Sequence, residues 1–307
     1  MRQGSEPTRQ PRQQSRGFVL VNALVLVAAL SAVSLALLSR AEGGRLRMLA
    51  ATDAVQLELY LDAYEALARA ILNADTNAVD HTREAWARDD NALTLDRGQV
   101  SGRLQDLQGR FNLNWLANPE DIAAREAFER LLTQLGVSTQ VGEQILAALR
   151  PGGSGLTKTG KASVAENLPG GTALMLDQLA IPERALRRLR SHIAVLPGDS
   201  QLNVNTTSAL VLTSFLSGVN PVALDALLST RRTEPFISMD DFADRLVQIM
   251  GAESAEALDT DRLSVGSEWF EVRISAKLEG RTATRQVVLQ RLSLPAGAQV
   301  AYRLDKW

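Results

Sequence analysis

The segment "SRGFVLVNALVLVAALSAV", residues 15–33, joins a basic leader to a long apolar run. The run continues without a charged residue from Phe18 to Ser39. At about 1.5 Å per residue, a helix of this length crosses a hydrocarbon core of about 30 Å. We therefore predict a transmembrane helix over residues 18–39.

The charges in front of this run predict its orientation. The leader carries Arg2, Arg9, Arg12 and Arg16, which only Glu6 opposes. Because positive flanks stay on the cytoplasmic side, residues 1–17 form a cytoplasmic leader and the bulk of the chain lies in the periplasm. A cleaved secretory signal would have a shorter apolar region followed by small residues. We thus expect a single-pass protein of the inner membrane.

Apolar residues keep a mostly helical spacing beyond the predicted span, which indicates that the same helix continues in water over residues 40–75.

Two later regions have the sequence pattern of strands. The first is 92–114, and the second is "EWFEVRISAKLEGRTATRQVVLQRL" at 268–292, where Glu279-Gly280 fits a two-residue hairpin turn. A lone hairpin is marginal, so residues 76–112 and 264–294 are predicted to form one antiparallel sheet domain, with 295–307 as a C-terminal tail.

Residues 113–263 show helical patterns and are predicted to be an inserted helical domain. An internal repeat lies within it. "FNLN" (111–114) and "LNVN" (202–205) each precede a helix, a turn containing Gly136 or Gly218, and a second helix. The second copy resembles helix-hairpin-helix modules. The predicted fold class is α+β, with a large all-helical insertion that carries helix-hairpin-helix-like repeats.

The composition narrows the classes of function. The 307 residues are 45% hydrophobic, enough for a substantial core, and the net charge of -2 gives no overall attraction to nucleic acid. The absence of cysteine excludes disulfides, thiolate metal sites and a cysteine nucleophile. The only histidines, His81 and His192, stand in dissimilar contexts, and no G-x-S-x-G motif is present. We therefore expect a protein that is not an enzyme.

Arg16-Gly17-Phe18 and the uncharged run after it resemble the type IV prepilin cleavage site. This resemblance implies that a prepilin peptidase cuts between Gly17 and Phe18 and methylates the new amino-terminal Phe18. Most pilins carry glutamate at the fifth mature position, where this chain has Asn22. A carboxylate in lipid is costly unless it is paired, and a subunit at the tip has no neighbour ahead to pair with it. Asn22 therefore favours a tip position.

From Arg16 to about Leu292 the chain resembles the GspK family, the large minor pseudopilins of type II secretion, which lack this glutamate. The resemblance implies a long N-terminal helix on a small antiparallel pilin-like sheet, interrupted by the helical domain. It implies a place at the pseudopilus tip, in support of the export of folded proteins across the outer membrane. The implied partners are other minor pseudopilins, the major pseudopilin, the prepilin peptidase and inner-membrane lipid.

The resemblance also implies structural Ca²⁺ in loops of the helical domain, with no ligands that can be carried over, and no other cofactor is expected. Carboxylates are the oxygen ligands that such a hard cation prefers. The adjacent acids that could supply them are Asp89, Asp90, Glu120, Asp121, Asp240, Asp241, Asp259 and Asp261. None follows the spacing of an EF-hand, so at any one of these positions an acidic surface is the simpler interpretation.

Two alternatives remain open. A membrane-tethered DNA-binding or uptake protein would use the helix-hairpin-helix copies, with Arg231 and Arg232 on phosphates. Each hairpin lacks one glycine of the usual pair that lets backbone amides approach a phosphate, so nucleic acid is not favoured. A minor pilin of a type IV pilus would share the leader and the apolar helix.

Overall fold

The computed structural model describes residues 15–88, 92–149, 154–156, 162–164, 179–216, 218–252 and 260–306. The chain divides into two compact units, Met1–Gln56 and Leu57–Trp307, and the boundary lies within the first helix. In chain order the helices, 3₁₀ helices (η) and strands are α1 (Ser15–Ala74), η1 (Ala85–Ala87), β1 (Ala92–Leu95), β2 (Gly98–Asp106), β3 (Phe111–Asn112), η2 (Leu113–Ala117), α2 (Ile122–Gln134), α3 (Thr139–Leu149), β4 (Ser154–Leu156), β5 (Ala162–Val164), α5 (Glu183–Leu189), β6 (Ile193–Ala194), β7 (Leu202–Asn203), α6 (Ala209–Phe215), α7 (Pro221–Thr233), α8 (Met239–Met250), β8 (Leu263–Ser264), β9 (Trp269–Leu278), β10 (Arg281–Arg291) and β11 (Ala298–Lys306).

Helix α1 runs without a break through Gly43 and Gly44. In the first unit its large apolar side chains from Phe18 to Leu38 are exposed. In the second unit the helix buries one face, because Leu57, Leu61, Tyr64, Ala68 and Leu72 recur at helical spacing. The two parts of α1 therefore differ: the first exposes its apolar side chains, and the second packs one apolar face into the core.

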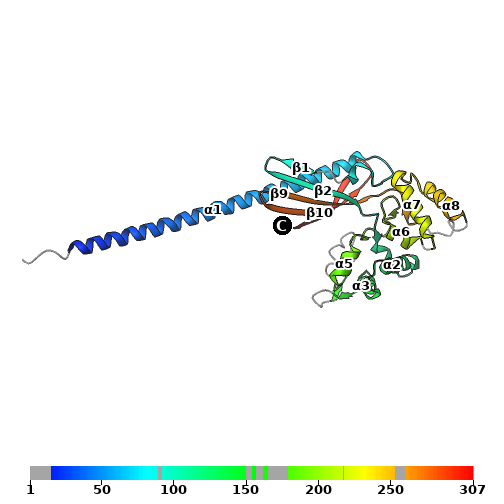
Figure 1. Ribbon diagram of the computed structural model, residues 1–307, viewed down its shortest axis with the longest axis horizontal. Helices are drawn as coiled ribbons and strands as arrows, with labels where there is room; N and C mark the ends of the chain where they lie inside the picture. Colours follow the sequence, from blue (N-terminus) through cyan, green and yellow to red (C-terminus); the bar gives the residue numbers. More distant parts are fainter. Residues whose placement is uncertain are drawn as a thin grey trace, which may run out of the picture. The chain divides into compact units, whose positions relative to one another are not determined.

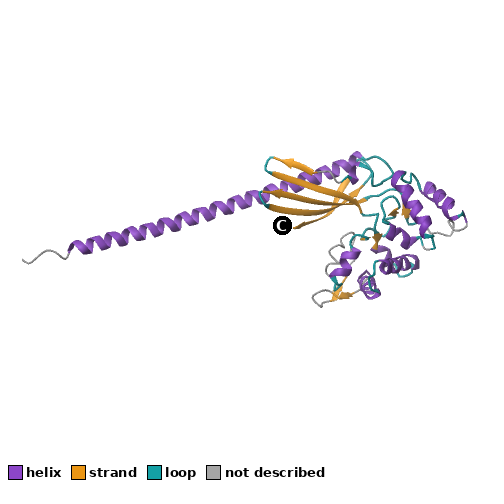
Figure 2. Cartoon of the chain, in the orientation of Figure 1, coloured by secondary structure: helices purple, strands orange, loops and turns teal. Residues whose placement is uncertain are grey.

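A five-stranded antiparallel sheet in the order β1-β2-β9-β10-β11 forms the centre of the second unit (Figures 1 and 2). Strands β9 and β10 form a hairpin whose two turn residues, Glu279 and Gly280, have φ of 46° and 83°. Positive φ at both turn positions matches the right-handed twist of the two strands. The early and late strands share one sheet, as the sequence predicts.

The last strand differs from the prediction. Residues 295–307 were expected to be a tail, but Ala298–Lys306 pairs with β10 as the edge strand β11. The pairing register shifts between Val288 and Leu289. This strand satisfies backbone groups that β10 would otherwise leave unpaired at the edge. The alternation of Ala298, Val300, Tyr302 and Leu304 was the signal available in the sequence.

One face of the sheet packs on α1, and close backbone approach makes this possible. The inward side chains of β9 alternate along the strand, and they are Phe270, Val272, Ile274, Ala276 and Leu278. Tyr64 of α1 lies over Gly102 of β2, where its hydroxyl donates to the Gly102 carbonyl at 2.7 Å. A Cβ at Gly102 would lie 2.4 Å from the Tyr64 ring, so only glycine fits there.

The chain leaves the sheet at Asp106 and returns at Trp269, and the helices between them have a core of their own. Phe111 lies at the centre of this core, with ring centroids 5.3 to 5.4 Å from Trp115, Phe128 and Phe215. Short parallel strand pairs, β3 with β6 and β7 with β8, tie distant parts of the insertion together. The predicted insertion is therefore present and mainly helical, but it is not all-helical, because the short strands β4 to β7 lie within it.

Helix-hairpin-helix repeats are not confirmed. Both segments contain two helices separated by a glycine with positive φ, which is 59° at Gly136 and 90° at Gly218. The segments differ before the first helix, because β3 enters η2 whereas β7 leads directly to α6. Helix α2 has 13 residues and α6 has 7. The shared N-x-N signal therefore does not impose one common module.

Candidate functional site

The predicted processing residues lie at the start of α1. Gly17 and Phe18 fall in its first turn, and the Phe18 side chain is 69% exposed. Asn22 lies about one turn further along and is also exposed. A peptidase that needs an extended substrate must open this turn, which glycine makes easier because it is a poor helix former. Cleavage, methylation and the role of Asn22 stay predictions.

Among the described helices, α1 is long and apolar enough to cross a membrane. Its most apolar 18-residue window has a mean hydropathy of 2.5, and none of that window is buried within the protein. These side chains need an apolar partner, which lipid or a neighbouring helix can supply. Length and composition thus fit a single-pass anchor.

Further along α1, acidic side chains hold the helix on the sheet. Arg285 of β10 is 3% exposed and binds Glu58 and Asp62, with 2.6 Å from its Nη1 to Oδ1 of Asp62. Glu65 lies 3.6 Å from the same guanidinium and pairs with Arg303 of β11 at 2.5 Å. A register change of α1 would leave the buried guanidinium of Arg285 without its partners, so this network fixes the position of α1 on the sheet.

A group of polar residues joins the insertion to the sheet, and we name it the polar junction. It consists of the buried residues Asp80, Asp106, Asn203 and Ser267 and the half-buried Arg291. Asn203 Nδ2 donates to the Asp80 carbonyl at 3.1 Å, to Asp106 Oδ2 at 3.1 Å and to Ser267 Oγ at 2.9 Å. Arg291 donates to Oδ2 of Asp80 and to the Ser267 carbonyl. The asparagine that the sequence marks as part of a repeat therefore links two parts of the fold.

Burial raises the pKa of both acids of the polar junction, Asp80 and Asp106. It raises the pKa of Asp80 to about 7, against the attraction of Arg291. Burial also raises the pKa of Asp106, against the hydrogen bonds donated by Ser267 and Thr206. These carboxyl groups are desolvated and are held by a network that links α1, β2 and the insertion.

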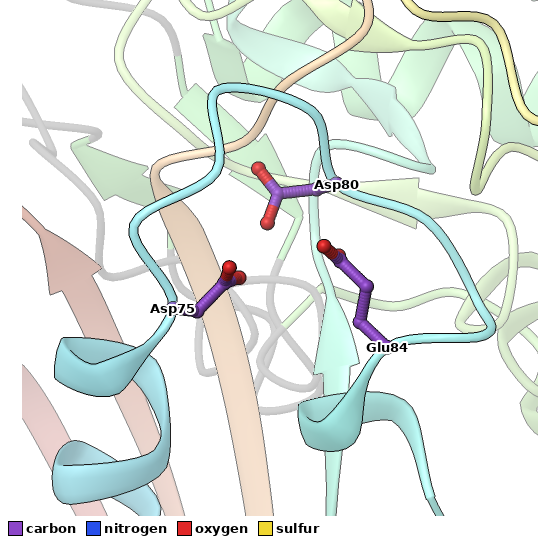
Figure 3. Close-up of side chains that lie close together, drawn as sticks. All are labelled: Asp75, Asp80 and Glu84. Atoms are coloured by element: carbon purple, nitrogen blue, oxygen red, sulfur yellow. The ribbon is translucent and has the colours of Figure 1, made fainter.

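A carboxylate cluster lies next to the polar junction, in the loop that follows α1. Asp75, Asp80 and Glu84 point toward one another in Figure 3, with candidate ligand oxygens within 4.8 Å of each other. Oδ1 of Asp80 and Oε1 of Glu84 are buried and have no hydrogen-bond partner. Sequence reasoning missed this cluster, because Asp75, Asp80 and Glu84 are not adjacent and match no known ligand spacing.

Two of the acids that the sequence proposed as loop ligands, Asp121 and Asp241, have other roles. Asp121 caps α2 by accepting from the Ala124 amide at 3.0 Å, and it pairs with Arg262. Asp241 pairs with Arg245 at 2.8 Å. Asp240 is exposed at the start of α8. Predictions at Asp89, Asp90 and Asp259 lie outside the described residues.

Of the two arginines considered for DNA contact, Arg232 is exposed and donates to Ser229 Oγ at 3.3 Å, whereas Arg231 holds a loop of the insertion. Nη1 of Arg231 donates to the carbonyls of Val204 at 2.5 Å and Thr207 at 2.8 Å. Its burial lowers its pKa to about 10. Arg188 likewise donates to the carbonyls of Leu135 and Gly136 after α2. Arg231 therefore serves the internal structure of the insertion and does not present its guanidinium to a phosphate.

The two asparagines of "NVNTTS", residues 203–208, also have structural roles. Asn203 Oδ1 accepts from the Asn205 amide at 2.9 Å. The Asn205 side chain bridges both backbone groups of Phe236, with 2.9 Å on each side. These bonds fix the segment before α6 against the segment before α8.

The sheet face opposite α1 lines an open groove of about 1270 Å³ that extends to α5. Glu271 of β9 is 2% exposed at its base, where it pairs with Arg110 at 3.2 Å and with Arg273 at 3.0 Å. Tyr302 of β11 also lines the groove, and burial raises its pKa to about 12. Both polar and apolar side chains line this groove, and Leu107, Ala194 and Tyr302 belong to a small apolar cluster beside it.

The sequence of this chain is similar to those of known proteins of bacterial type II secretion systems. Residues 202–266 match the sequence model of the family described as Type II secretion system (T2SS), protein K. The chain is similar to type II secretion system protein K of Pseudomonas aeruginosa, at 28% identity over 91% of this chain and 90% of the relative. It is also similar to the protein of that name from Aeromonas hydrophila, at 28% identity over 76% and 80% of the two chains.

The fold is similar to a chain in the crystal structure of the GspK-GspI-GspJ complex from the enterotoxigenic Escherichia coli type 2 secretion system. The TM-score is 0.70 at 22% identity, over 85% of this chain and 99% of that chain. The long helix, antiparallel sheet and further helices are therefore a known arrangement. Together the comparisons confirm the predicted resemblance to GspK and support a minor pseudopilin of type II secretion.

Proposed function

We propose that this relative of type II secretion system protein K caps the tip of the pseudopilus together with other minor pseudopilins, and so supports the export of folded proteins across the outer membrane. The observation that carries this proposal is similarity over 91% of the chain to a protein K, together with the apolar N-terminal helix. Such a role is structural and needs no catalytic residue.

The proposed topology places residues 1–17 in the cytoplasm, residues 18–39 in the inner membrane and the remaining chain in the periplasm. The arginine-rich leader and the exposed apolar run support this arrangement. Prepilin peptidase is the proposed processing enzyme, with cleavage between Gly17 and Phe18 and methylation of Phe18. The apolar run then contacts lipid, or the helices of other pseudopilins, including the major one.

The proposed partner surface is the exposed part of α1 beyond the membrane. Its large apolar side chains are exposed, and they are Leu46, Met48, Leu49, Val55 and Leu59. An apolar stripe on a helix is buried most readily against another helix. The related chain was crystallised in a complex with GspI and GspJ, which supports minor pseudopilins as the partners of this surface.

The insertion supports the proposed tip position. It leaves β2 at Asp106 and returns to β9 at Trp269, at the end of the sheet where α1 also ends (Figure 1). Another subunit stacked beyond this end of the sheet would meet the insertion. Asn22 agrees with this steric argument, because a tip subunit has no neighbour ahead whose charge could pair with a glutamate.

The first experiment is an intact-mass measurement on the full chain, expressed with and without a prepilin peptidase. We expect the peptidase to remove residues 1–17 and to add one methyl group to Phe18. Substitution of Gly17→Leu should block cleavage, because a side chain at this position obstructs an extended substrate. Cleavage elsewhere, or an uncut leader in the presence of the peptidase, would contradict the proposed processing.

The tip role needs a separate experiment. Cysteines introduced singly at Leu49 and Val55 should crosslink to another minor pseudopilin in membranes, since the natural chain has no cysteine that could interfere. A cysteine at the exposed Ile122 of the insertion is the matched control. Crosslinking from Ile122 alone, or to the major pseudopilin alone, would argue against the proposed surface.

A further inference from the structure

The carboxylate cluster of Asp75, Asp80 and Glu84 carries an inference that does not depend on the pseudopilin role. Its three side chains leave the end of α1 and the loop before η1, and their carboxylates converge on one small space (Figure 3). Asp80 is 0% exposed, yet its Oδ1 has no hydrogen-bond partner. A buried and unsatisfied carboxylate oxygen is costly, so this space needs an occupant.

Asp80 and Glu84 each have one carboxylate oxygen held by the protein, whereas Oδ1 of Asp75 also accepts from the Asn77 amide at 3.3 Å. Oδ2 of Asp75 accepts from Arg291 Nη1 at 2.9 Å, and Oδ2 of Asp80 accepts from Arg291 Nη2. Oε2 of Glu84 accepts from the His81 amide at 2.9 Å and from Trp86 Nε1 at 2.8 Å. Oδ1 of Asp80 and Oε1 of Glu84 remain without partners. Outer-shell hydrogen bonds of this kind orient carboxylates that bind a metal ion.

The negative charge of the cluster also favours a bound cation. Two of the three carboxylates, those of Asp75 and Asp80, share the guanidinium of Arg291. Oδ1 of Asp80 and Oε1 of Glu84 receive no hydrogen bond from the described residues. A divalent cation between the free oxygens would offset the remaining negative charge.

We propose that Asp75, Asp80 and Glu84 bind a hard divalent cation, Ca²⁺, through Oδ1 of Asp80, Oε1 of Glu84 and a carboxylate oxygen of Asp75. Carboxylate oxygens suit Ca²⁺, which takes 6–8 oxygen ligands in flexible geometry. Water and backbone carbonyls fill the other positions. The resemblance to GspK implies calcium only in loops of the helical domain, whereas this site lies outside it, in the loop after α1.

The site is connected to both parts of the second unit. The Asp80 amide donates to the Val265 carbonyl at 2.9 Å, and the Asp80 carbonyl accepts from Asn203 of the insertion. A cation that fixes the Asp80 side chain therefore also fixes the contact between the insertion and the sheet. Ca²⁺ should stabilise the folded chain, because it binds the native state and not the unfolded one.

Calorimetric titration of CaCl₂ into the detergent-solubilised full chain, after removal of metal with EGTA, tests the proposal. We expect one Ca²⁺ per chain and a rise in Tm that grows with Ca²⁺ concentration. Glu84→Gln and Asp75→Asn should each weaken binding by about tenfold or more. Asp240→Asn removes an exposed acid outside the cluster and should leave the affinity unchanged.

Trp86 offers a readout that locates the ion. Its Nε1 donates to Glu84, so Tb³⁺ bound at the cluster should show tryptophan-sensitised emission that Ca²⁺ displaces. Trp86→Phe should lose most of this emission, and it should also bind Ca²⁺ less tightly, because it removes the hydrogen bond that orients the Glu84 carboxylate. The absence of Ca²⁺ binding in the wild-type chain would overturn the proposal. Equal affinity in wild type, Glu84→Gln and Asp75→Asn, or full emission from Trp86→Phe, would place the ion elsewhere and overturn it as well.

Discussion

Arg285 shows how much a single side chain controls where α1 packs on the sheet. It extends from β10 toward the helix and is surrounded by Glu58, Asp62 and Glu65. Asp62 is 57% exposed, so part of this network is screened by water, whereas the Arg285 side chain is 2% exposed. The network therefore fixes the position of α1 mainly through the buried guanidinium of Arg285.

Substitution of Arg285→Met should destabilise the folded chain by about 1–3 kcal/mol, since it removes the buried guanidinium, while the exposed Glu58 and Asp62 can be solvated and Glu65 keeps its pair with Arg303. Urea denaturation measures the effect. The matched control is Arg187→Met, which removes an exposed arginine whose 3.6 Å pair with Glu183 lies on the surface. That change should cost less than about 1 kcal/mol. Equal effects of the two substitutions would contradict the argument.

His192 gives a pH dependence with a definite sign. Burial and the nearby Arg110 hold its pKa below the ordinary value, so the fold favours the neutral ring. Its contribution to stability is present above the unfolded-state pKa of about 6.5 and is lost as the pH falls below it, toward the folded-state pKa. Wild type should therefore lose more stability than His192→Gln between about pH 7.5 and about pH 5.

Urea denaturation of both proteins at the two pH values checks this prediction. Asp80 and Asp106 have raised pKa values, which act in the opposite direction, but both proteins contain them. The difference between the two curves therefore isolates His192. A difference that does not change with pH would show that the ring does not titrate differently on folding.

At the scale of elements, the contact between α1 and β2 depends on a missing side chain. Tyr64 is fully buried against Gly102, and its hydroxyl donates to the carbonyl of that glycine. The sequence pattern predicts both elements and their apolar faces. It does not predict that a glycine within a strand marks the site of closest approach, because a strand glycine is equally typical of a bulge or an edge.

Gly102→Ala should destabilise the chain by about 1–3 kcal/mol, because the added methyl group overlaps the Tyr64 ring and the carbonyl of Arg273. Thermal unfolding measures the loss. Gly198→Ala is the control, since nothing lies within 4 Å of the Cβ it would add. A larger loss for Gly198→Ala than for Gly102→Ala would exclude the packing explanation.

At the scale of the whole second unit, the polar junction couples the insertion to the sheet. Asn203 belongs to the insertion and donates to groups of the loop after α1, of β2 and of the segment before β9. Asn205, two residues later, bonds only to groups within the insertion in the hydrogen bonds described here. Two similar residues therefore provide a matched pair for testing this coupling.

Asn203→Ala should cost about 1–3 kcal/mol for the buried groups it leaves unsatisfied, and it should increase amide exchange in both the insertion and the β2–β9 end of the sheet. Asn205→Ala should increase exchange mainly near Phe236. Hydrogen exchange followed by mass spectrometry distinguishes the two patterns. Identical patterns for the two variants would show that Asn203 has no special coupling role.

The sequence by itself determined the features that depend on local composition and period. The uncharged run from Phe18 to Ser39 requires an apolar environment, and alternation over 268–292 requires a hairpin with one buried face. The same local signals carried the resemblance at Arg16, Gly17 and Phe18. They also predicted the insertion at residues 113–263, which lies within the observed interval between Asp106, where the chain leaves the sheet, and Trp269, where it rejoins it.

Only the tertiary structure decided the features that depend on which distant residues meet. It placed residues 298–306 at the sheet edge, turned Arg231 inward and brought Asn203 to Asp106. It also brought Asp75, Asp80 and Glu84 together around two unpartnered oxygens. A charge pattern does not reveal such contacts, because the burial and the partner of a polar group are set by the packing of the whole chain.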